Sequence, residues 1–389
     1  MDFRFTPQQE QFRQEVRAFL QAELPRFQSG PAEEGEGGIN KPFSRRLGEK
    51  GWIGLAWPRE HGGQGLGFVS QAIYWEEMLL ASAPINYHFI AERQMGPSII
   101  MFGTEEQKRF FLPRIMRGEC SFSIGYSEPD TGSDLASLKT RAVQDGDDYV
   151  INGAKVWNSS HRGADYIWLA TRTNPDAPKH RGISVFIVDL KLPGITIQPI
   201  LNMANIPGFC LVTFDQVRVP KGMMVGEKDR GWYVVAGNLD FERSGIERVS
   251  YCYPLFREFL AFVREGALGG KRLADDPRVR ARLAEMEIEY QVGRLLAYKV
   301  AWMQDQGVVP NLEASVSKLF GTEVSQRMAR TMAEVLGMYG QLEPGSPWAP
   351  LKGRVERAWV YAIPRTIAGG TSEVMRNIIA LRGLGLPRG

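Results

Sequence analysis

Apolar residues recur at helical spacing through the first third of the chain. Thr6 and Gln9 form a capping-box pattern, with a proline at the first helical position between them. The apolar face that follows consists of Phe12, Val16, Phe19 and Leu20. Thr104 and Gln107 repeat the same start signal before a second helix that ends near Gly118. We therefore expect a helical N-terminal domain over residues 1–121.

Beyond residue 121 the hydrophobic period changes. Short runs rich in β-branched and aromatic residues alternate with turn clusters such as NPDAP and LPG. The runs cover residues 148–157, 166–173, 183–190, 195–201 and 209–219. They predict a β-barrel-like middle domain over residues 122–230. From residue 231 to 389 the helical period returns and predicts a C-terminal four-helix bundle, so the expected fold is α+β and multidomain.

Composition and charge narrow the class of protein. The 389 residues carry 47 Lys and Arg against 44 Asp and Glu, and this small excess does not favour a nucleic-acid partner. No apolar run approaches the length of a membrane span, and the first residues lack a signal-peptide pattern, so we expect a cytoplasmic protein. Three cysteines and four histidines are scattered without ligand spacing, which argues against a disulfide framework and a metal site.

Two segments of the middle domain have the chemistry of a ligand site. The first, GYSEPDTGSD at 125–134, is an irregular loop whose backbone N–H groups and hydroxyls, those of Ser127 and Ser133, suit an anion or a polar ring edge. By itself it is more typical of a solvated turn than of a ligand site. The second, GAKVWNSS at 153–160, ends a strand with Trp157 and Ser159, which suit a planar cofactor. A core tryptophan at a strand end is the alternative.

Two further segments lie in the C-terminal part. In IAGGTSEVMRNIIALR, at 367–382, small residues precede a helix that starts near Thr371, an arrangement that suits a phosphate or carbonyl group. A simple helix cap is the alternative. In NLDFERSGIERV, at 238–249, charged residues crowd one helix, and most such runs are solvated faces.

Together, and in this order, these segments resemble the acyl-CoA dehydrogenase family of flavoproteins. The resemblance runs over nearly the whole chain and includes GWIGLAWPREHGGQG and LPRIMRGE. It implies that FAD lies between the β domain and the C-terminal bundle, with a neighbouring subunit completing the site. The residues it places at the cofactor are Tyr126, Ser127, Ser133, Trp157, Ser159, Arg264, Thr371 and Glu373. It places Ser133, Asp240 and Arg243 at the CoA thioester.

The family reaction, α,β-desaturation of an acyl-CoA, needs a carboxylate that removes the Cα proton while the Cβ hydride passes to flavin N5. Many members have a glutamate directly before the Gly-Thr pair of the third segment, where this chain has Gly369. A minority, including isovaleryl-CoA and long-chain enzymes, supply it from the first helix of the bundle. The matching residue is Glu242, with Glu247 a weaker candidate. We expect a branched, cyclic or otherwise bulky acyl group.

Other departures concern the cofactor contacts between subunits. Arg264 lies in VREGALGG, where the family often has an aromatic-glycine pair, and Glu334 stands where an amide is common. The resemblance implies a homotetramer, or a heterotetramer with a related chain, that passes electrons to an electron-transfer flavoprotein. Two other hypotheses remain open: a non-catalytic or half-site subunit, and a flavin monooxygenase or oxidase of the same fold.

Overall fold

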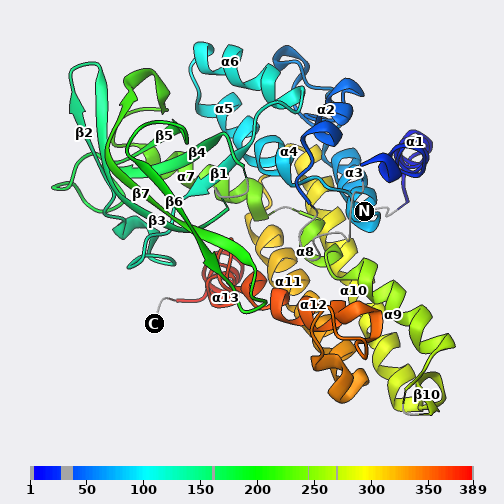
Figure 1. Ribbon diagram of the computed structural model, residues 1–389. Coiled ribbons are helices and arrows are strands. Elements are labelled where there is room, and N and C mark those ends of the chain that lie inside the picture. The colour runs from blue at the N-terminus through cyan, green and yellow to red at the C-terminus, as the bar shows by residue number, and fades with distance from the viewer. Residues whose placement is uncertain (1–3, 28–37, 160–162, 244, 269, 388–389) are drawn as a thin grey trace. The chain divides into compact units, whose positions relative to one another are not determined.

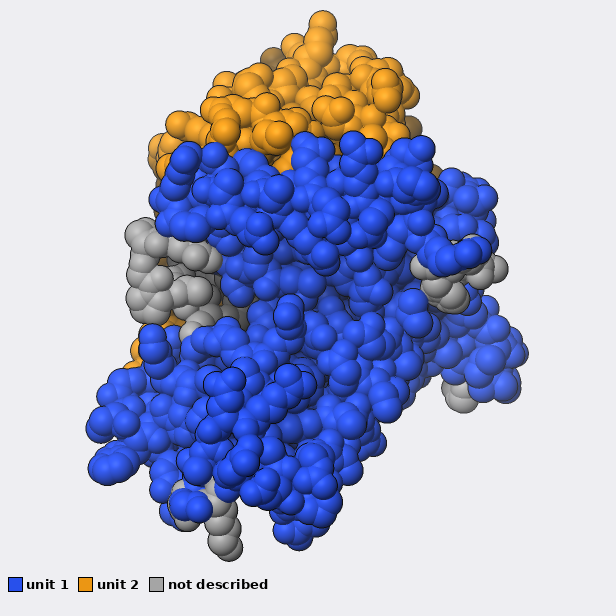
Figure 2. All heavy atoms as spheres, turned by 90° about the vertical axis from the view of Figure 1, so that its right-hand side faces the viewer, with its two compact units in different colours: residues 1–38, 67–84, 243–389 blue, residues 39–66, 85–242 orange. Residues whose placement is uncertain are grey.

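The computed structural model describes residues 4–27, 38–159, 163–243, 245–268 and 270–387, and only the backbone of residues 240, 242, 243 and 271. Its contacts divide the chain into two compact units, each assembled from separate stretches of sequence (Figure 2). Unit 1 comprises residues 1–38, 67–84 and 243–389, and unit 2 comprises residues 39–66 and 85–242.

Unit 2 is built around an eight-stranded sheet with the order β6-β7-β3-β2-β4-β5-β8, in which β1 pairs with β4 (Figure 1). Its strands are β1 (Phe122–Gly125), β2 (Arg141–Asp145), β3 (Asp148–Asn158), β4 (Tyr166–Arg172), β5 (Ile183–Asp189), β6 (Ile195–Leu201), β7 (Pro207–Pro220) and β8 (Met224–Val225). The five predicted runs are all strands, with ends that agree to within two residues. The strands that the sequence did not predict, β1, β2 and β8, have five residues or fewer, too short for a clear alternating pattern.

Side chains alternate along each strand, so one hydrophobic cluster forms on a single face of the sheet, and β4 and β5 are buried on both faces. Tyr149, Ile151, Leu169 and Phe186 are almost completely buried there. Each contributes roughly 1.5–3 kcal/mol by leaving water. This packing fixes the register of β3 against β2 and β7, and therefore fixes where the end of β3 lies.

Short helices complete unit 2. They are α2 (Lys41–Glu49), α4 (Asn86–Ile90), the π-helical turn η3 (Ala91–Met95), α5 (Gly96–Phe102), α6 (Glu105–Met116) and α7 (Gly231–Arg243), whose last residue falls in unit 1. The predicted capping box of α6 is confirmed, because the Thr104 hydroxyl accepts from the Gln107 N–H and the Gln107 side chain accepts in return.

Unit 1 is helical. It contains α1 (Pro7–Glu23), α3 (Phe68–Leu80), α8 (Glu247–Ser250), α9 (Tyr253–Glu265), α10 (Pro277–Asp305), α11 (Asn311–Leu336), α12 (Arg354–Ala362) and α13 (Ser372–Ile378), with the small hairpin β9 (Ala267–Leu268) and β10 (Lys271–Arg272). The capping box at Thr6 is confirmed. The longest helices of its described residues are α10 and α11, with 29 and 26 residues. None of the helices in the described ranges is both long and apolar enough to cross a membrane.

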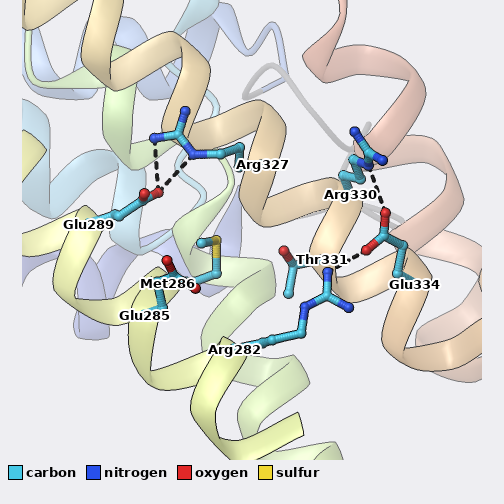
Figure 3. Close-up of a pocket in the computed structure, with 8 residues that line it drawn as sticks. All are labelled: Arg282, Glu285, Met286, Glu289, Arg327, Arg330, Thr331 and Glu334. Carbon is cyan, nitrogen blue, oxygen red and sulfur yellow. Dashed lines mark hydrogen bonds and ion pairs between the residues drawn. The ribbon is translucent and has the colours of Figure 1, made fainter. Parts of the chain in front are cut away.

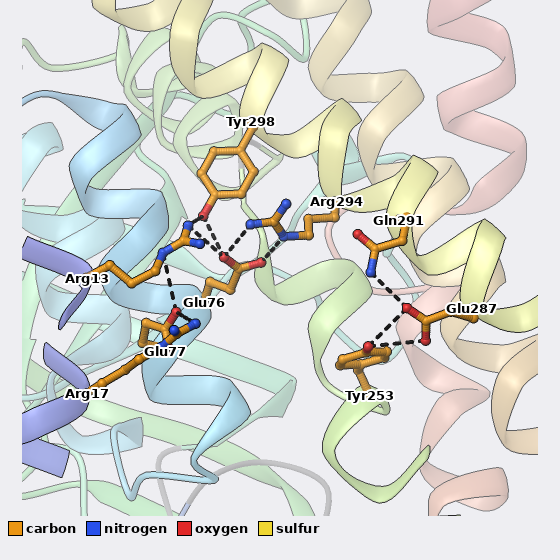
Figure 4. Close-up of polar contacts among 9 residues, drawn as sticks. All are labelled: Arg13, Arg17, Glu76, Glu77, Tyr253, Glu287, Gln291, Arg294 and Tyr298. Carbon is orange, nitrogen blue, oxygen red and sulfur yellow. Dashed lines mark hydrogen bonds and ion pairs between the residues drawn. The ribbon is translucent and has the colours of Figure 1, made fainter. Parts of the chain in front are cut away.

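A buried cluster of charges joins α1 and α3 to α10 within unit 1 (Figure 4). The Glu76 carboxylate accepts hydrogen bonds from Arg13 at 3.3 Å, from the Tyr298 hydroxyl at 2.7 Å and from Arg294 through both of its oxygens. Burial by itself would lower the pKa of Arg294, but Glu76 raises it above its ordinary value, so the guanidinium stays charged. Removing one member of such a cluster leaves an uncompensated buried charge, which costs about 3–5 kcal/mol.

Candidate functional site

The loop 125–134 follows β1 and is held against β3 by a buried ion pair. The Lys155 ammonium, on β3, is completely buried and donates to the Glu128 carboxylate at 2.8 Å and to the Tyr126 carbonyl at 3.0 Å. The same carboxylate accepts the backbone N–H groups of Lys139 and Thr140 at 2.6 and 2.8 Å. These contacts leave little freedom at the start of the loop.

Both members of this pair have shifted pKa values. Burial lowers the pKa of Lys155 to about 8, so the ammonium is still mostly protonated at pH 7. Burial would raise the pKa of Glu128, but the charge and hydrogen bond of Lys155 and the two backbone donors outweigh it and lower that pKa below its ordinary 4.5. The pair is therefore ionised at neutral pH.

The second half of the loop is more exposed. Ser133, expected near substrate and cofactor, is exposed to solvent, and the neighbouring Asp134 accepts from Lys179 at 2.8 Å. Arg172, on β4, anchors the chain just after this loop by donating to the Leu138 carbonyl at 3.4 Å. It also donates to the Lys179 carbonyl at 3.0 Å. Ser133 thus lies on a solvent-exposed segment, and the chain that follows it is anchored at Leu138.

Trp157 sits in a strained backbone conformation at the end of β3. Its φ is 66°, which is unusual for a bulky residue, and the register of β3 with β7 shifts between Val156 and Asn158. The indole is 59% exposed and touches Phe209 edge to face. The alternative of a core tryptophan is therefore wrong. Ser159 follows it and is half-buried.

The loop and the strand meet at Ser127. The Val156 N–H donates to the Ser127 carbonyl at 2.9 Å, so the loop runs beside the strand end that carries Trp157. Tyr126 is buried, and its hydroxyl donates to Asn238 of α7 at 3.1 Å. Unit 2 therefore brings Tyr126, Ser127 and Trp157 into one region, as their predicted common role requires.

The predicted base and CoA contacts lie at the end of α7. Asp240, Glu242 and Arg243 belong to this helix, and their side chains lie outside the described part of the structure. Glu247, the weaker candidate for the base, is buried in α8, where it pairs with Arg248 at 3.3 Å. Burial beside an arginine is typical of a structural carboxylate.

In unit 1 the predicted cofactor segment is a turn that ends at α13. Gly369 and Gly370 have φ values of 66° and 93°, which favour glycine. The completely buried Lys318 of α11 donates to the Gly370 carbonyl at 2.6 Å. Thr371 caps α13 by accepting the Val374 N–H at 3.2 Å, so the predicted helix start near Thr371 is confirmed, and Thr371 has the role of the alternative, a helix cap. Glu373 is exposed in the first turn of α13, where its own backbone N–H and Thr371 lower its pKa.

Arg264, the other predicted cofactor contact of unit 1, is exposed near the end of α9. Its carbonyl accepts a hydrogen bond from Arg272 of the β9–β10 hairpin at 3.2 Å. This contact fixes the backbone at Arg264 and leaves its guanidinium on the surface.

A charged pocket of about 310 Å³ lies between α10 and α11 (Figure 3). Its lining consists of Arg282, Glu285, Met286, Glu289, Arg327, Arg330, Thr331 and Glu334. The Glu334 carboxylate accepts from Arg282 and, at 2.7 Å, from Arg330, and these two hydrogen bonds lower its pKa. A glutamate at this position therefore has two local cationic partners. None of the predicted flavin or substrate residues lines this pocket.

The residues that position the site were not predicted from the sequence. Lys155 lies an even number of positions after the buried Tyr149 and Ile151 on β3, so its side chain points to the same face as theirs. A lysine at such a position indicates a buried partner for its charge. The partner, Glu128, gave no such signal, because it lies in an irregular loop. Asn238 and Arg172 act through contacts between distant segments, which a single sequence does not reveal.

Comparison with known proteins identifies the family. Family models described as the acyl-CoA dehydrogenase N-terminal, middle and C-terminal domains match residues 6–119, 123–217 and 229–384. The acyl-CoA dehydrogenase FadE26 of Mycobacterium tuberculosis is 42% identical over 405 aligned positions, covering 100% of this chain and 99% of the relative.

Solved structures agree with this result. A structure titled the Tcur3481-Tcur3483 steroid ACAD matches with a TM-score of 0.90 at 36% identity, and the ChsE4-ChsE5 complex from Mycobacterium tuberculosis matches with 0.89 at 41%. Each match covers 100% of both chains. The predicted order of helical, β and helical domains is confirmed, while its limits at residues 121 and 230 stay predictions. The chain belongs to the acyl-CoA dehydrogenase family, oxidoreductases that desaturate acyl-CoA thioesters between Cα and Cβ.

Proposed function

We propose that this chain binds FAD and desaturates an acyl-CoA with a bulky, polycyclic acyl group, with Glu242 as the base. The observation that carries the base assignment is the turn at Gly369, whose φ of 66° and missing side chain leave no carboxylate where many members have one. A minority of the family supplies this carboxylate from the first helix of the bundle, and Glu242 occupies the matching position.

The residues of unit 2 suit a flavin. An exposed indole in a strained conformation offers a flat apolar face to a planar ring, and Ser127 and Ser159 offer hydroxyl groups close in sequence to Tyr126 and Trp157. When bound, the flavin supplies the acceptor for the Cβ hydride. Thr371, Glu373 and Arg264 are further cofactor contacts in this proposal, Arg264 by pairing its exposed guanidinium with the pyrophosphate.

The protein's own part in the reaction is to bind the thioester and remove a proton. Asp240 and Arg243 would hold the CoA portion, together with the exposed Ser133. The Glu242 carboxylate would take the Cα proton and become a carboxylic acid while the Cβ hydride leaves with its electron pair. A general base is most efficient when its pKa lies near the working pH. Burial beside an acyl chain raises the pKa of a carboxylic acid toward that range, because it disfavours the charged form.

The acyl group and the assembly are proposed from the relatives. One similar structure is titled a steroid ACAD, and both similar structures carry the names of two chains. We propose an acyl group of the steroid type and a heterotetramer with a related chain. An electron-transfer flavoprotein would reoxidise the cofactor.

The experiment compares Glu242→Gln with Glu247→Gln in anaerobic titrations. Flavin absorbance is followed while short, long, branched and steroid-type acyl-CoAs are added in turn. We expect Glu242→Gln to retain FAD and the thioester but to lose flavin reduction, because glutamine keeps the shape and lacks the base. Glu247→Gln should still be reduced. The reverse result would assign the base to Glu247.

A half-site subunit is the second candidate. Glu334 favours it, because this carboxylate stands where the family commonly has an amide and is paired with Arg282 and Arg330. Purification decides between the two: a chain that is yellow and bleached by a thioester when purified alone contains a complete site. A colourless chain that becomes yellow only with its related partner is a half-site subunit.

A further inference from the structure

Asn238 is completely buried on α7 and holds three other segments of unit 2. Its amide oxygen accepts the Tyr126 hydroxyl at 3.1 Å. Its amide nitrogen donates to the Gln94 carbonyl at 3.3 Å and to the Ser98 hydroxyl oxygen at 3.0 Å. Both ends of the amide are therefore satisfied, and the side chain has one orientation in which all three contacts form.

The same helix has a second anchor one turn later. Arg93 donates to the Phe241 carbonyl at 3.3 Å. The last carbonyls of a helix have no partner within the helix, and a cation there is favourable. Arg93 and Gln94 both belong to the π-helical turn η3, all of whose residues are buried. Such turns are rare and occur frequently at functional sites.

These anchors lie directly beside the proposed base in the chain. Asn238 precedes Glu242 by four residues, which is about one turn of an α-helix, and Phe241 is its immediate neighbour. Tyr126, on the other side of Asn238, belongs to the loop that would contact the flavin. Asn238 thus connects the helix that carries the base with the loop that would hold the hydride acceptor.

A polar side chain is a costly choice for a completely buried position. An apolar residue of similar size would pack without a desolvation penalty, whereas a buried amide is tolerated only when its hydrogen bonds are made. The amide makes directional hydrogen bonds, and such a network fixes one arrangement of the elements that it joins. Proton abstraction requires a fixed position of the base, since a misplacement of about 1 Å costs about 100-fold in rate.

We propose that Asn238 is a positioning residue for proton abstraction, which sets the end of α7 against the loop 125–134. The inference rests on the proposed role of Glu242. It predicts that loss of the amide slows the reaction step while substrate and cofactor binding remain.

The test uses Asn238→Leu and the milder Ser98→Ala, which removes one acceptor and keeps the amide. The control is Tyr87→Phe, because Tyr87 is also buried in unit 2 and its hydroxyl donates to Asp165 at 2.8 Å. For each variant we measure FAD content, acyl-CoA affinity, melting temperature and the limiting rate of anaerobic flavin reduction. Asn238→Leu should reduce its flavin about 10- to 100-fold more slowly at unchanged acyl-CoA affinity, and Ser98→Ala should show a smaller loss. Tyr87→Phe should lose stability only.

The outcomes separate this inference from the function on which it rests. If Glu242→Gln reduces its flavin at the parent rate, the base assignment fails and the positioning role fails with it. If Glu242→Gln is inactive while Asn238→Leu and Ser98→Ala match Tyr87→Phe in rate, only the role of Asn238 is wrong. Should Asn238→Leu not fold, a parent rate in Ser98→Ala overturns the inference and a slower rate at unchanged affinity supports it.

Discussion

The two segments expected to contact the flavin are held by different means. The loop 125–134 of unit 2 and the turn 367–373 of unit 1 each receive a hydrogen bond from the ammonium of a completely buried lysine. Lys155 shares its charge with Glu128, which itself binds two backbone N–H groups. Lys318 donates to a carbonyl in a turn whose two glycines adopt positive φ. A network of side chains thus holds the loop 125–134, whereas the turn 367–373 depends more on the backbone conformation of its glycines.

This difference decides which substitutions each segment tolerates. A network of side chains fails when one member is removed, because a buried charge is then left without its partner. A turn built on glycine tolerates changes around it but not a Cβ at the glycine itself.

Lys155→Met should have the largest effect. It leaves the buried Glu128 without its cation, and we expect a loss of about 3–5 kcal/mol in the free energy of unfolding. FAD content should fall as well, because the loop loses its anchor. The control is Lys139→Met, since Lys139 pairs with Asp130 on the surface at 3.3 Å and such pairs contribute about 1 kcal/mol or less. Equal losses in denaturant unfolding would mean that the buried pair does not hold the loop.

Gly370→Ala should cost less, about 1–3 kcal/mol. Its φ of 93° disfavours a side chain, and an added Cβ would lie 2.6 Å from the end of Met375. Gly345→Ala is a matched control, because Gly345 has a φ of 95° and open space around it. Thermal unfolding of both variants separates backbone strain, which they share, from crowding, which only Gly370→Ala has. If Gly370→Ala is no less stable than Gly345→Ala, crowding plays no part in this turn.

Acidification should have the smallest effect. The pKa of Glu128 is lowered in the folded protein, so its contribution to stability is complete above pH 4.5 and is lost as the pH falls through the lower folded value. Glu128→Gln removes this dependence. The parent should therefore lose stability more steeply than the variant as the pH falls below 4.5. Denaturant titrations at each pH measure both slopes, and parallel curves below pH 4.5 would contradict the shift.

The contrast also explains what the sequence could predict. Glycines, caps and alternating strands are local signals, so the cap at Thr371 and the course of β3 followed from the residues themselves. The strain at Trp157 was not predicted, because it arises from a register shift between two strands. The partners of Lys155 and Asn238 depend on how the chain returns on itself, and no local pattern encodes that.

The candidate site was predicted mainly through its resemblance to a family. Residue types alone left Trp157 open between a core position and a cofactor contact, and the structure decides this in favour of exposure. For Glu242, neither the residue type nor the structure by itself identifies the role. Its assignment as the base rests on the resemblance and on its position at the end of α7.

The Glu76 cluster has a consequence for the order in which the protein is made. Glu76 and its partner Arg294 are 218 residues apart in sequence. A ribosome that adds about 5–20 residues per second therefore takes roughly 10–45 s to deliver the arginine after the glutamate. During that interval α1 and α3 lack the α10 surface on which they pack, and their apolar faces are open to chaperones. Unit 1 can be completed only near the end of synthesis, whereas unit 2 has left the ribosome by then.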